Sequence, residues 1–484
     1  MVADAIRKFK KEKPIEFVFK ETKGDKDLES PLWKMSEKGV FTKDFRADLL
    51  ADKFDMVVHS WKDLELEPDP ETEIISVLAR ADQRDLLLFK KSSLQNPPET
   101  IKIFTSSPRR VFNLNTALKE IFPISLRKLP LEFLPIRGSI RRRIEKWLDS
   151  NIDGIVVAKA AVDRILTEDY TEAQLPELVE ERNFLKKVLV DSLFMCLPLS
   201  LNPNAPAQGG IAVEIRKGRE DLKALLSKIS YPDVAKAILK EREELAKHGG
   251  GCHQKIGVSV LIRKKAMLIS KRGETDSGQL LQEYRFLIEH QPKASHPKKI
   301  WPKKGEGLTF ERNFLPMEKP PAGNLLITRI SAWNPNWKKE DLTGIVWAAG
   351  IKTMKELADL DIWVNGSLDG LGEEEGIGLE KILPKAKFLK LTHDHTDSIE
   401  SRFERIATYS LTLKDEIPNI QNKTHFFWMS ASQFDLVFEK YPSIKDAYHA
   451  SGPGITCRHI EKKIGKKVDV FLSYEDWLDY HTEH

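Results

Sequence analysis

The chain has 484 residues, with 77 Lys and Arg against 73 Asp and Glu, so its formal net charge is +4. This balance argues against a protein that binds a polyanion over its whole surface, but it leaves room for a local basic pocket. Hydrophobic residues make up 41% of the chain, which excludes a mostly disordered protein. The cysteines, Cys196, Cys252 and Cys457, form no CxxC pair, so we expect neither a disulfide framework nor a metal site. We expect a cytoplasmic protein without a membrane span.

The first 290 residues alternate helical and strand-like patterns, which predicts α/β layers with a largely parallel sheet. Apolar residues at helical spacing lead into a predicted strand at 54–58. Ser139 is a predicted N-cap for a helix through Leu148, and a strand at 155–158 and a helix at 161–166 follow it. Residues 291–322 contain six prolines and little periodicity, so we expect a linker there.

Beyond this linker, two stretches echo each other. Residues 345–364 and 450–471 each read as a strand, a Gly-containing turn, a helix and a second strand. Two similar α/β halves that face each other would form a cleft. The segment from His393 to Asp397 could be drawn as a metal cluster, but we expect a surface loop after a strand.

The segment His59-Ser60-Trp61-Lys62-Asp63 directly follows the predicted strand at 54–58. The carboxyl end of a strand is where an α/β sheet presents functional groups, and here one ammonium lies beside one carboxylate. Taken alone, the pattern favours a solvated surface turn over a functional group.

Arginines gather at several strand ends. Thr105-Ser106-Ser107-Pro108-Arg109-Arg110 follows a strand at 101–104, and Arg137 precedes Gly138 at the start of the helix that carries Arg141, Arg142 and Arg143. Guanidinium groups and helix N-termini suit carboxylates and phosphates, so this supply predicts a pocket for a polyanion. Nucleic acid is the rival ligand, but no aromatic-rich strand accompanies the arginines. A solvated helix face accounts for two of the three arginines at 141–143.

Three glycines precede Cys252, and His253 and Lys255 follow it. The glycines let a bulky group approach the sulfur, and the neighbouring cations favour the reactive thiolate. Burial as a small hydrophobic residue describes Cys196 and Cys457 better than Cys252.

Taken together and in this order, these motifs resemble the porphobilinogen deaminase (hydroxymethylbilane synthase) family over roughly residues 8–290. Three further segments of the chain, residues 38–43, 161–164 and 206–209, also match the pattern of this family. The resemblance implies a multi-domain α/β fold, with two lobes like those of anion-binding proteins and a small α+β third domain. The implied domains are 1–76 with 190–217, 77–189 and 218–290, followed by the linker 291–322 and a region 323–484.

The resemblance also implies roles for individual residues. Cys252 would hold a dipyrromethane cofactor through a thioether, and Asp63 would be the catalytic carboxylate that handles protons and stabilises cationic pyrroles as ammonia leaves. Four porphobilinogen units would add in turn to make hydroxymethylbilane. Carboxylates of the cofactor and growing chain would be bound by Ser60, Lys62, Thr105, Ser106, Ser107, Arg109, Arg110, Arg137, Arg143, Arg164 and Gln208.

The sequence departs from the family pattern in places. The family's first strand, with an Arg and a Ser that contact the cofactor, has no counterpart in the sequence. Phe104 and Ala207 stand where the family usually has Gly.

Residues 323–484 resemble uroporphyrinogen-III synthase, an α/β protein of two lobes whose cleft guides ring closure of the linear tetrapyrrole. The matching pieces lie at 325–329, 348–353, 426–432 and 450–456, and the implied cleft contacts are Thr353, Ser430, Ser432 and Thr456.

Three hypotheses follow for function. The first is a monomeric bifunctional enzyme of tetrapyrrole biosynthesis, with porphobilinogen and the linear tetrapyrrole as ligands and neither nucleic acid nor membrane as partner. The second is a deaminase with a non-catalytic C-terminal module. The third is a non-catalytic anion-binding protein of the same fold. Asp63 and Cys252 argue against the third, because a binder needs neither residue, whereas the missing first strand argues for it.

Overall fold

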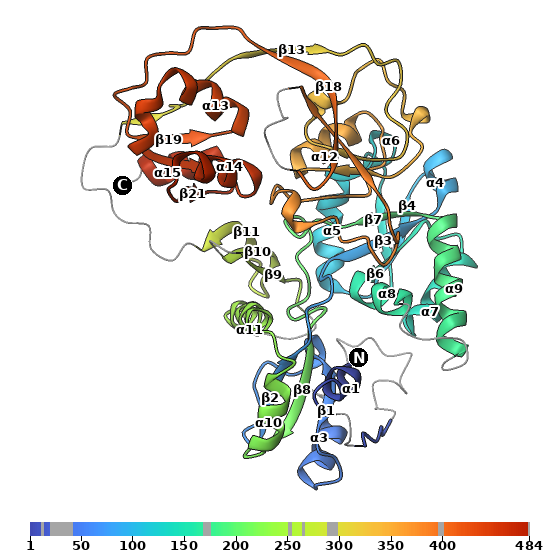
Figure 1. Ribbon diagram of the computed structural model, residues 1–484. Coiled ribbons are helices and arrows are strands. Elements are labelled where there is room, and N and C mark those ends of the chain that lie inside the picture. Colours follow the sequence, from blue (N-terminus) through green and yellow to red (C-terminus); the bar gives the residue numbers. More distant parts are fainter. Residues whose placement is uncertain are drawn as a thin grey trace. The chain divides into compact units, whose positions relative to one another are not determined.

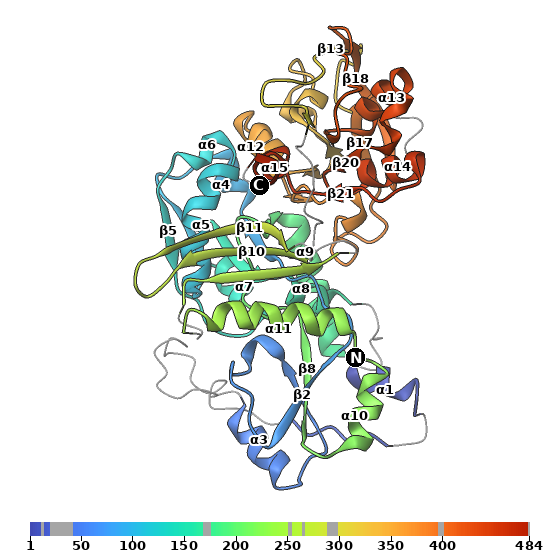
Figure 2. The same cartoon turned by 90° about the vertical axis from the view of Figure 1, so that its left-hand side faces the viewer.

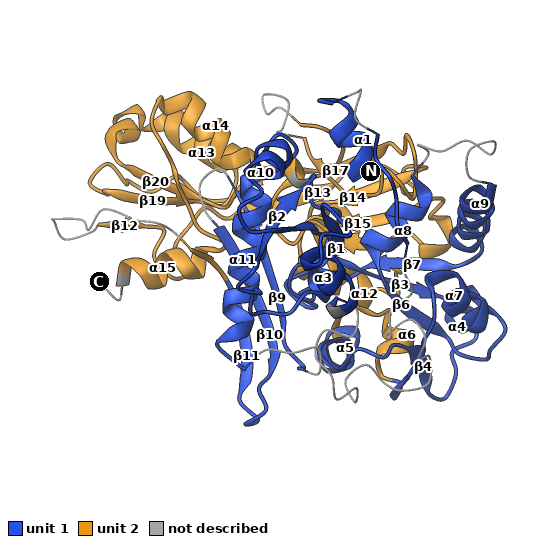
Figure 3. Cartoon of the chain, turned by 90° about the horizontal axis from the view of Figure 1, so that it is seen from below, with its two compact units in different colours: residues 1–118, 129–284 blue, residues 119–128, 285–484 orange. Residues whose placement is uncertain are grey.

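The computed structural model describes residues 1–10, 14–19, 42–167, 176–249, 254–263, 267–287, 299–394 and 401–482 (Figure 1). It divides into two compact units (Figure 3). The first comprises residues 1–118 and 129–284, and the second comprises 119–128 and 285–484. In the described part of the chain, no helix combines the length and apolar character that a membrane span requires.

The first sheet of unit 1 has the order β1-β8-β2, from β1 (Val57–Ser60), β2 (Thr72–Val77) and β8 (Ile211–Arg216). Both outer strands pair antiparallel with β8. The prediction of a largely parallel sheet is therefore wrong here, because β8 returns from far along the chain and runs opposite to both neighbours. Helices α1 (Val2–Arg7), α3 (Lys43–Leu50) and α10 (Glu220–Ser227) belong to this part. Leucines of α10 pack on β8, so α10 lies with this sheet rather than with the third domain where we expected it.

The second sheet of unit 1 has the order β5-β4-β6-β3-β7. Strand β4 pairs parallel with β5 and β6, whereas β3 pairs antiparallel with β6 and β7. Strand β7 was expected in the first domain, and its pairing places it here instead. Ser139 caps α7 as predicted, because its Oγ accepts from the Arg142 N–H at 3.3 Å. The bounds are β3 (Asp85–Phe89), α4 (Lys91–Gln95), β4 (Ile101–Phe104), α5 (Pro108–Ile121), β5 (Leu131–Leu134), α7 (Ile140–Leu148), β6 (Gly154–Ala158), α8 (Lys159–Leu166), α9 (Pro176–Asp191) and β7 (Leu193–Cys196).

The third part of unit 1 combines one helix with three strands, as the α+β expectation requires. Helix α11 (Pro232–Ala246) runs alongside a sheet of order β11-β10-β9, formed by β9 (Gly257–Ile262), β10 (Met267–Glu274) and β11 (Leu280–Leu287) (Figure 2). Strands β9 and β10 are antiparallel.

Unit 2 contains a six-stranded sheet of order β13-β18-β17-β14-β15-β16 and a four-stranded sheet of order β12-β19-β20-β21. Both sheets are parallel except for the β13–β18 pair. The bounds of the six-stranded sheet are β13 (Phe310–Phe314), β14 (Asn324–Ile327), β15 (Val346–Ala348), β16 (Gly366–Ser367), β17 (Phe388–His393) and β18 (Glu404–Leu413). The bounds of the other sheet are β12 (Ile300–Trp301), β19 (His425–Trp428), β20 (Tyr448–Ser451) and β21 (Asp469–Val470).

Helices complete unit 2. They are α6 (Ile124–Arg127), η3 (Ile330–Ala332), η4 (Lys339–Asp341), α12 (Ile351–Asp359), η5 (Glu373–Glu375), α13 (Ala431–Lys440), η6 (Pro442–Asp446), α14 (Ile455–Ile464) and α15 (Tyr474–Thr482).

The expected linker at 291–322 contains two of these strands, β12 and β13. That expectation is wrong for residues 299–322, because Pro302 and Pro316 lie outside the paired residues and so do not interrupt either ladder. Residues 291–298 lie outside the described part of the chain. The internal echo is confirmed, since β15–α12–β16 and β20–α14–β21 are both parallel β-α-β units. In the β15–α12–β16 segment, the second strand begins at Gly366. Residues 362–364, where we expected that strand, form a buried loop.

Candidate functional site

The turn that carries Asp63 follows β1 directly. Strand β1 ends at Ser60, and η2 (Trp61–Asp63) forms one turn of 3-10 helix. Trp61 holds this turn in place: its side chain is buried, and its backbone N–H donates to the Gly210 carbonyl at 3.0 Å. With the indole inside, Lys62 is half-buried and the Asp63 carboxylate is exposed. The turn therefore presents a carboxylate to solvent from a fixed backbone.

Positive charge gathers around Lys62. Burial lowers the pKa of the Lys62 ammonium, and the charges of Arg110 and Arg143 lower it further, while Asp63 and Asp85 oppose them. Burial also lowers the pKa of Arg143 to about 10, with further contributions from Arg110 and Arg137. The Nε of Arg143 is buried and has no hydrogen-bond partner among the described residues. Lys62, Arg110, Arg137 and Arg143, called the cation cluster below, form a site that favours an anion.

A buried carboxylate that the sequence analysis missed organises the arginines. Asp85, the first residue of β3, is fully buried and accepts from Arg109 Nη2 at 2.8 Å and from Arg110 Nη2 and Nε at 2.6 and 3.0 Å. Asn202 Nδ2 donates to it at 3.0 Å. The charges and hydrogen bonds of Arg110 and Arg109 hold the pKa of Asp85 far below its usual range, although burial opposes them. The sequence signal for Asp85 was available: a carboxylate stands at the start of the otherwise apolar run of β3, where a charged residue would need a partner.

Gln208 reaches the same carboxylate, because its Nε2 donates to Asp85 Oδ1 at 3.0 Å and to the Gln83 carbonyl at 2.8 Å. The turn that holds it lies tight against the chain: a Cβ on Gly209, whose φ is +82°, would meet the Ala81 carbonyl at 2.5 Å. Arg109 and Gln208 thus already bind a carboxylate of the chain itself.

The predicted hydroxyl residues tie loops together. Ser106 Oγ donates to the Ile136 carbonyl at 2.6 Å and accepts from the Ile136 N–H at 2.8 Å, which joins the loop before α5 to the loop of Arg137. Thr105 is buried and accepts from the Ser107 N–H at 3.3 Å. Ser60 is half-buried at the end of β1. Arg164 is exposed in the last turn of α8.

Cys252, the predicted point of cofactor attachment, lies outside the described residues.

Arg141 lies on a solvated helix face, as we expected for two of the three arginines at 141–143. It pairs with Glu145 and with the exposed Glu180, each at 2.8 Å.

Unit 2 has a cavity of about 210 Å³ whose lining residues come from the six-stranded sheet and the loop after β14, and from the starts of α13 and α14. Ser430, Ser432 and Thr456, three of the implied cleft contacts, line this cavity at the N-terminal ends of α13 and α14. Thr353 does not, since it is buried and its Oγ1 donates to the Thr328 carbonyl at 3.4 Å. The lining also includes side chains that the sequence analysis missed: Thr328, Arg329, Lys390, Thr392, His393, Arg405 and Tyr409. Basic groups and hydroxyls together suit carboxylates.

His393 was expected in a surface loop, but it is the last residue of β17 and is buried. Residues 395–397 of that motif lie outside the described part of the chain.

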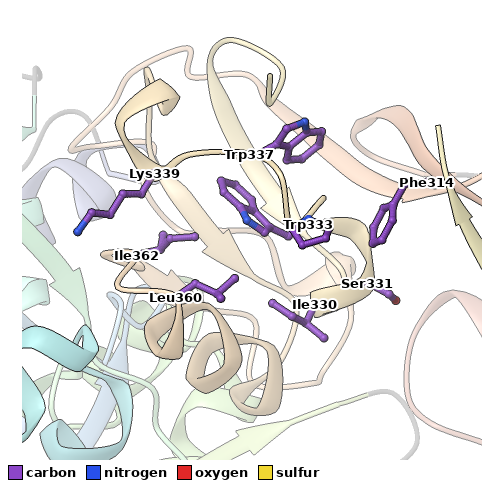
Figure 4. Close-up of a pocket in the computed structure, with 9 residues that line it drawn as sticks. Phe314, Ile330, Ser331, Trp333, Trp337, Lys339, Leu360 and Ile362 are labelled. Carbon is purple, nitrogen blue, oxygen red and sulfur yellow. The ribbon is translucent and has the colours of Figure 1, made fainter. Parts of the chain in front are cut away.

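A larger cavity of about 410 Å³ in unit 2 has a different character (Figure 4). Its lining is largely apolar, with Trp333 and Trp337 in an edge-to-face arrangement at 5.3 Å between ring centroids. Its cation, Lys339, pairs with Asp361. This chemistry does not suit a polycarboxylate.

Comparison with known proteins matches residues 1–224 to the family model described as "Porphobilinogen deaminase, dipyromethane cofactor binding domain". A porphobilinogen deaminase of Clostridium novyi is 32% identical over 284 residues, which are 57% of this chain and 85% of that protein. One of Desulfitobacterium hafniense is 31% identical over 56% of this chain and 77% of its own length. Among solved structures, the ancestral amino acid-binding protein AncCDT-1 covers 42% of this chain at 14% identity, and its TM-score of 0.16 supports no argument.

Proposed function

Because the chain belongs to the porphobilinogen deaminase family, we propose that it joins four porphobilinogen molecules into hydroxymethylbilane and releases ammonia. The observation that carries this proposal is the cation cluster beside Asp63. Arg143 has a buried Nε with no partner among the residues that the structure describes, and such a group next to other cations favours an anionic ligand.

Lys62, Arg137 and Arg143 would bind the carboxylates of substrate and product, while Arg110, which is held on Asp85, would add positive charge to the site. The exposed Asp63 carboxylate, held on the η2 turn, would accept or return a proton at its Oδ atoms and stabilise positive charge on a pyrrole. Ser60 lies next in the chain to this turn and would contribute a hydroxyl. Ser106 and Ser107 would position the loop before α5.

Arg109 and Gln208 receive a different role from the one that the resemblance implied. Both donate to Asp85, so we propose that they fix the position of Arg110 rather than bind substrate. Thr105, which is buried, would act in the same indirect way.

The dipyrromethane cofactor fits this site because the cation cluster would be matched by a polycarboxylate ligand. Cys252 would attach it, and the cation cluster would hold its acidic side chains. When bound, the dipyrrole supplies the end to which pyrrole units are joined.

The test of this function is turnover of porphobilinogen by the purified full chain. We expect release of ammonia and formation of hydroxymethylbilane, with both abolished in Cys252→Ser. A folded protein with no turnover and no attached dipyrrole would contradict the proposal and favour a non-catalytic anion-binding protein.

A second function, cyclisation of the linear tetrapyrrole to uroporphyrinogen III, is proposed for residues 323–484. It is supported by the 210 Å³ cavity, where Arg329, Arg405 and Thr456 meet the hydroxyls of Ser430 and Ser432. Hydroxymethylbilane given to the full chain should form the type III isomer faster than the uncatalysed reaction does. Arg405→Met should remove that advantage, whereas Lys414→Met, at an exposed residue just beyond β18, should keep it. Equal rates with and without the protein would leave a deaminase with a non-catalytic C-terminal module.

A further inference from the structure

Helix α11 lies against the turn that carries Asp63. Trp61 and Leu64, on either side of Lys62 and Asp63, form one buried cluster with Ile238 of α11 and with Ala207 and Ala212. The apolar side of the turn is therefore packed on this helix, and the polar side chains of Lys62 and Asp63 point away from that cluster.

One turn further along α11, Arg242 reaches the backbone of the same turn. Its Nη1 donates to the Leu64 carbonyl at 3.1 Å and lies 3.5 Å from the Trp61 carbonyl, and its Nη2 donates to the Glu65 carbonyl. Burial lowers the pKa of Arg242 to about 10, and no charged group in the described part of the chain contributes to this shift. Most buried guanidinium groups are paired with a carboxylate, whereas this one is held by main-chain carbonyls.

The residue before Arg242 fixes the helix itself. Glu241 is fully buried and accepts from Arg80 Nη1 and Nη2 at 2.9 and 2.8 Å, from the Ala207 N–H at 2.7 Å and from the Val260 N–H at 2.8 Å. Ala207 immediately precedes Gln208, which binds Asp85. Two adjacent residues of α11 thus connect to the Asp63 turn and to the turn beside Asp85.

We propose that Arg242 is a positioning residue: it holds the backbone of residues 61–65 so that the Asp63 carboxylate stays beside the cation cluster. Arg242 contacts carbonyl oxygens of the turn, and it acts on the reaction only through the placement of Asp63. The effect on turnover rests on the proposed function, whereas the effect on the turn does not. A displacement of about 1 Å at a catalytic group can lower a rate by about 100-fold.

The test compares Arg242→Met, which keeps most of the stem and removes the donors, with Arg242→Lys, which keeps the charge. Lys236→Met is the matched control, because Lys236 is exposed on the same helix. In the full chain, Arg242→Met should raise amide hydrogen exchange of residues 61–65 at least about 10-fold and leave exchange in β9 unchanged. It should lower kcat by about 10- to 100-fold with KM within about threefold, and Arg242→Lys should lie between it and the parent.

Parent-like exchange at residues 61–65 in Arg242→Met would overturn the proposal, whatever the activity. Faster exchange with parent-like kcat would also overturn it, since the turn would then not need to be held. If Arg242→Met does not fold, the same outcomes are read from Arg242→Lys. A parent protein that turns over no porphobilinogen contradicts the proposed function, and exchange alone then decides whether Arg242 holds the turn.

Discussion

Arg110 donates two hydrogen bonds to the buried Asp85 carboxylate, from Nη2 to Oδ1 at 2.6 Å and from Nε to Oδ2 at 3.0 Å. This bidentate pair fixes the plane of the guanidinium at the start of α5. Because Arg110 also contributes to the positive charge at Lys62 and Arg143, an acidic residue inside the protein sets the position of a cation in the anion site.

Asp85→Asn should destabilise unit 1 strongly. The change leaves Arg109 and Arg110 without their shared carboxylate, and removal of one partner from a buried ion pair costs about 3–5 kcal/mol. Urea unfolding followed by tryptophan fluorescence measures the loss. Asp221→Asn is the control, since it breaks an exposed pair with Arg219 and should cost far less. Equal losses in the two variants would contradict the central role of Asp85.

Asp63→Asn should leave the unfolding transition unchanged, because the carboxylate is exposed, and should lower kcat for porphobilinogen by about 100-fold or more. Glu67→Gln changes another exposed carboxylate a few residues away and should keep the parent rate. Near-parent turnover in Asp63→Asn would remove Asp63 from the mechanism.

Cys252→Ser should abolish covalent attachment of the dipyrrole, because the hydroxyl is a far weaker nucleophile than a thiolate. Intact-mass spectrometry of the parent should show the added mass of one dipyrrole, and Cys457→Ser, at a buried cysteine of unit 2, should retain it. Persistence of the added mass in Cys252→Ser would place the attachment elsewhere.

Arg143→Met should impair turnover and cofactor retention more than thermal stability. Its Nε has no partner among the described residues, so the folded protein loses little when the group is removed. Arg142→Met, at the exposed neighbouring position on α7, provides the control and should retain parent activity. A loss of activity that only follows a lower Tm would make Arg143 a structural residue.

The stability of unit 2 should fall as the pH falls from about 7 to 4. His449 is buried and neutral: Trp428 Nε1 donates to its Nδ1 at 2.9 Å, and its Nε2 donates to the Ile444 carbonyl at 2.9 Å. Burial lowers the pKa of His449 to about 4 from the ordinary 6.5. Between these values the unfolded chain binds more protons, so up to about 3 kcal/mol of stability present above pH 6.5 is lost by pH 4.

The measurement is the urea unfolding of the parent and of His449→Gln at several pH values between 4 and 7. The slope of the unfolding free energy against pH should be shallower in the variant, whatever its absolute stability. Parallel slopes would show that another group causes the acid sensitivity.

Local patterns in the chain were sufficient for several elements. Ser139 predicted the start of α7 because an N-cap needs only a side-chain oxygen and the next turn of backbone. The strand β6 and the two β-α-β echoes followed from apolar runs and glycine turns, which are also local signals. The Lys62-Asp63 pair after β1 was likewise visible, since strand and turn are adjacent in the chain.

Contacts between distant residues decided the rest. The direction of β8 between β1 and β2 depends on a return of the chain from beyond the second sheet, and no local pattern encodes that direction. Asp85 and Arg242 became part of the site only when strands, turns and α11 were packed together, and only this packing gave Gln208 its place beside Asp85. Residue type and local periodicity therefore determined which groups could carry the chemistry. Burial and pairing, which are properties of the packed protein, decided that Arg109 and Arg110 bind the protein's own Asp85 carboxylate, whereas the buried Nε of Arg143 has no partner among the described residues.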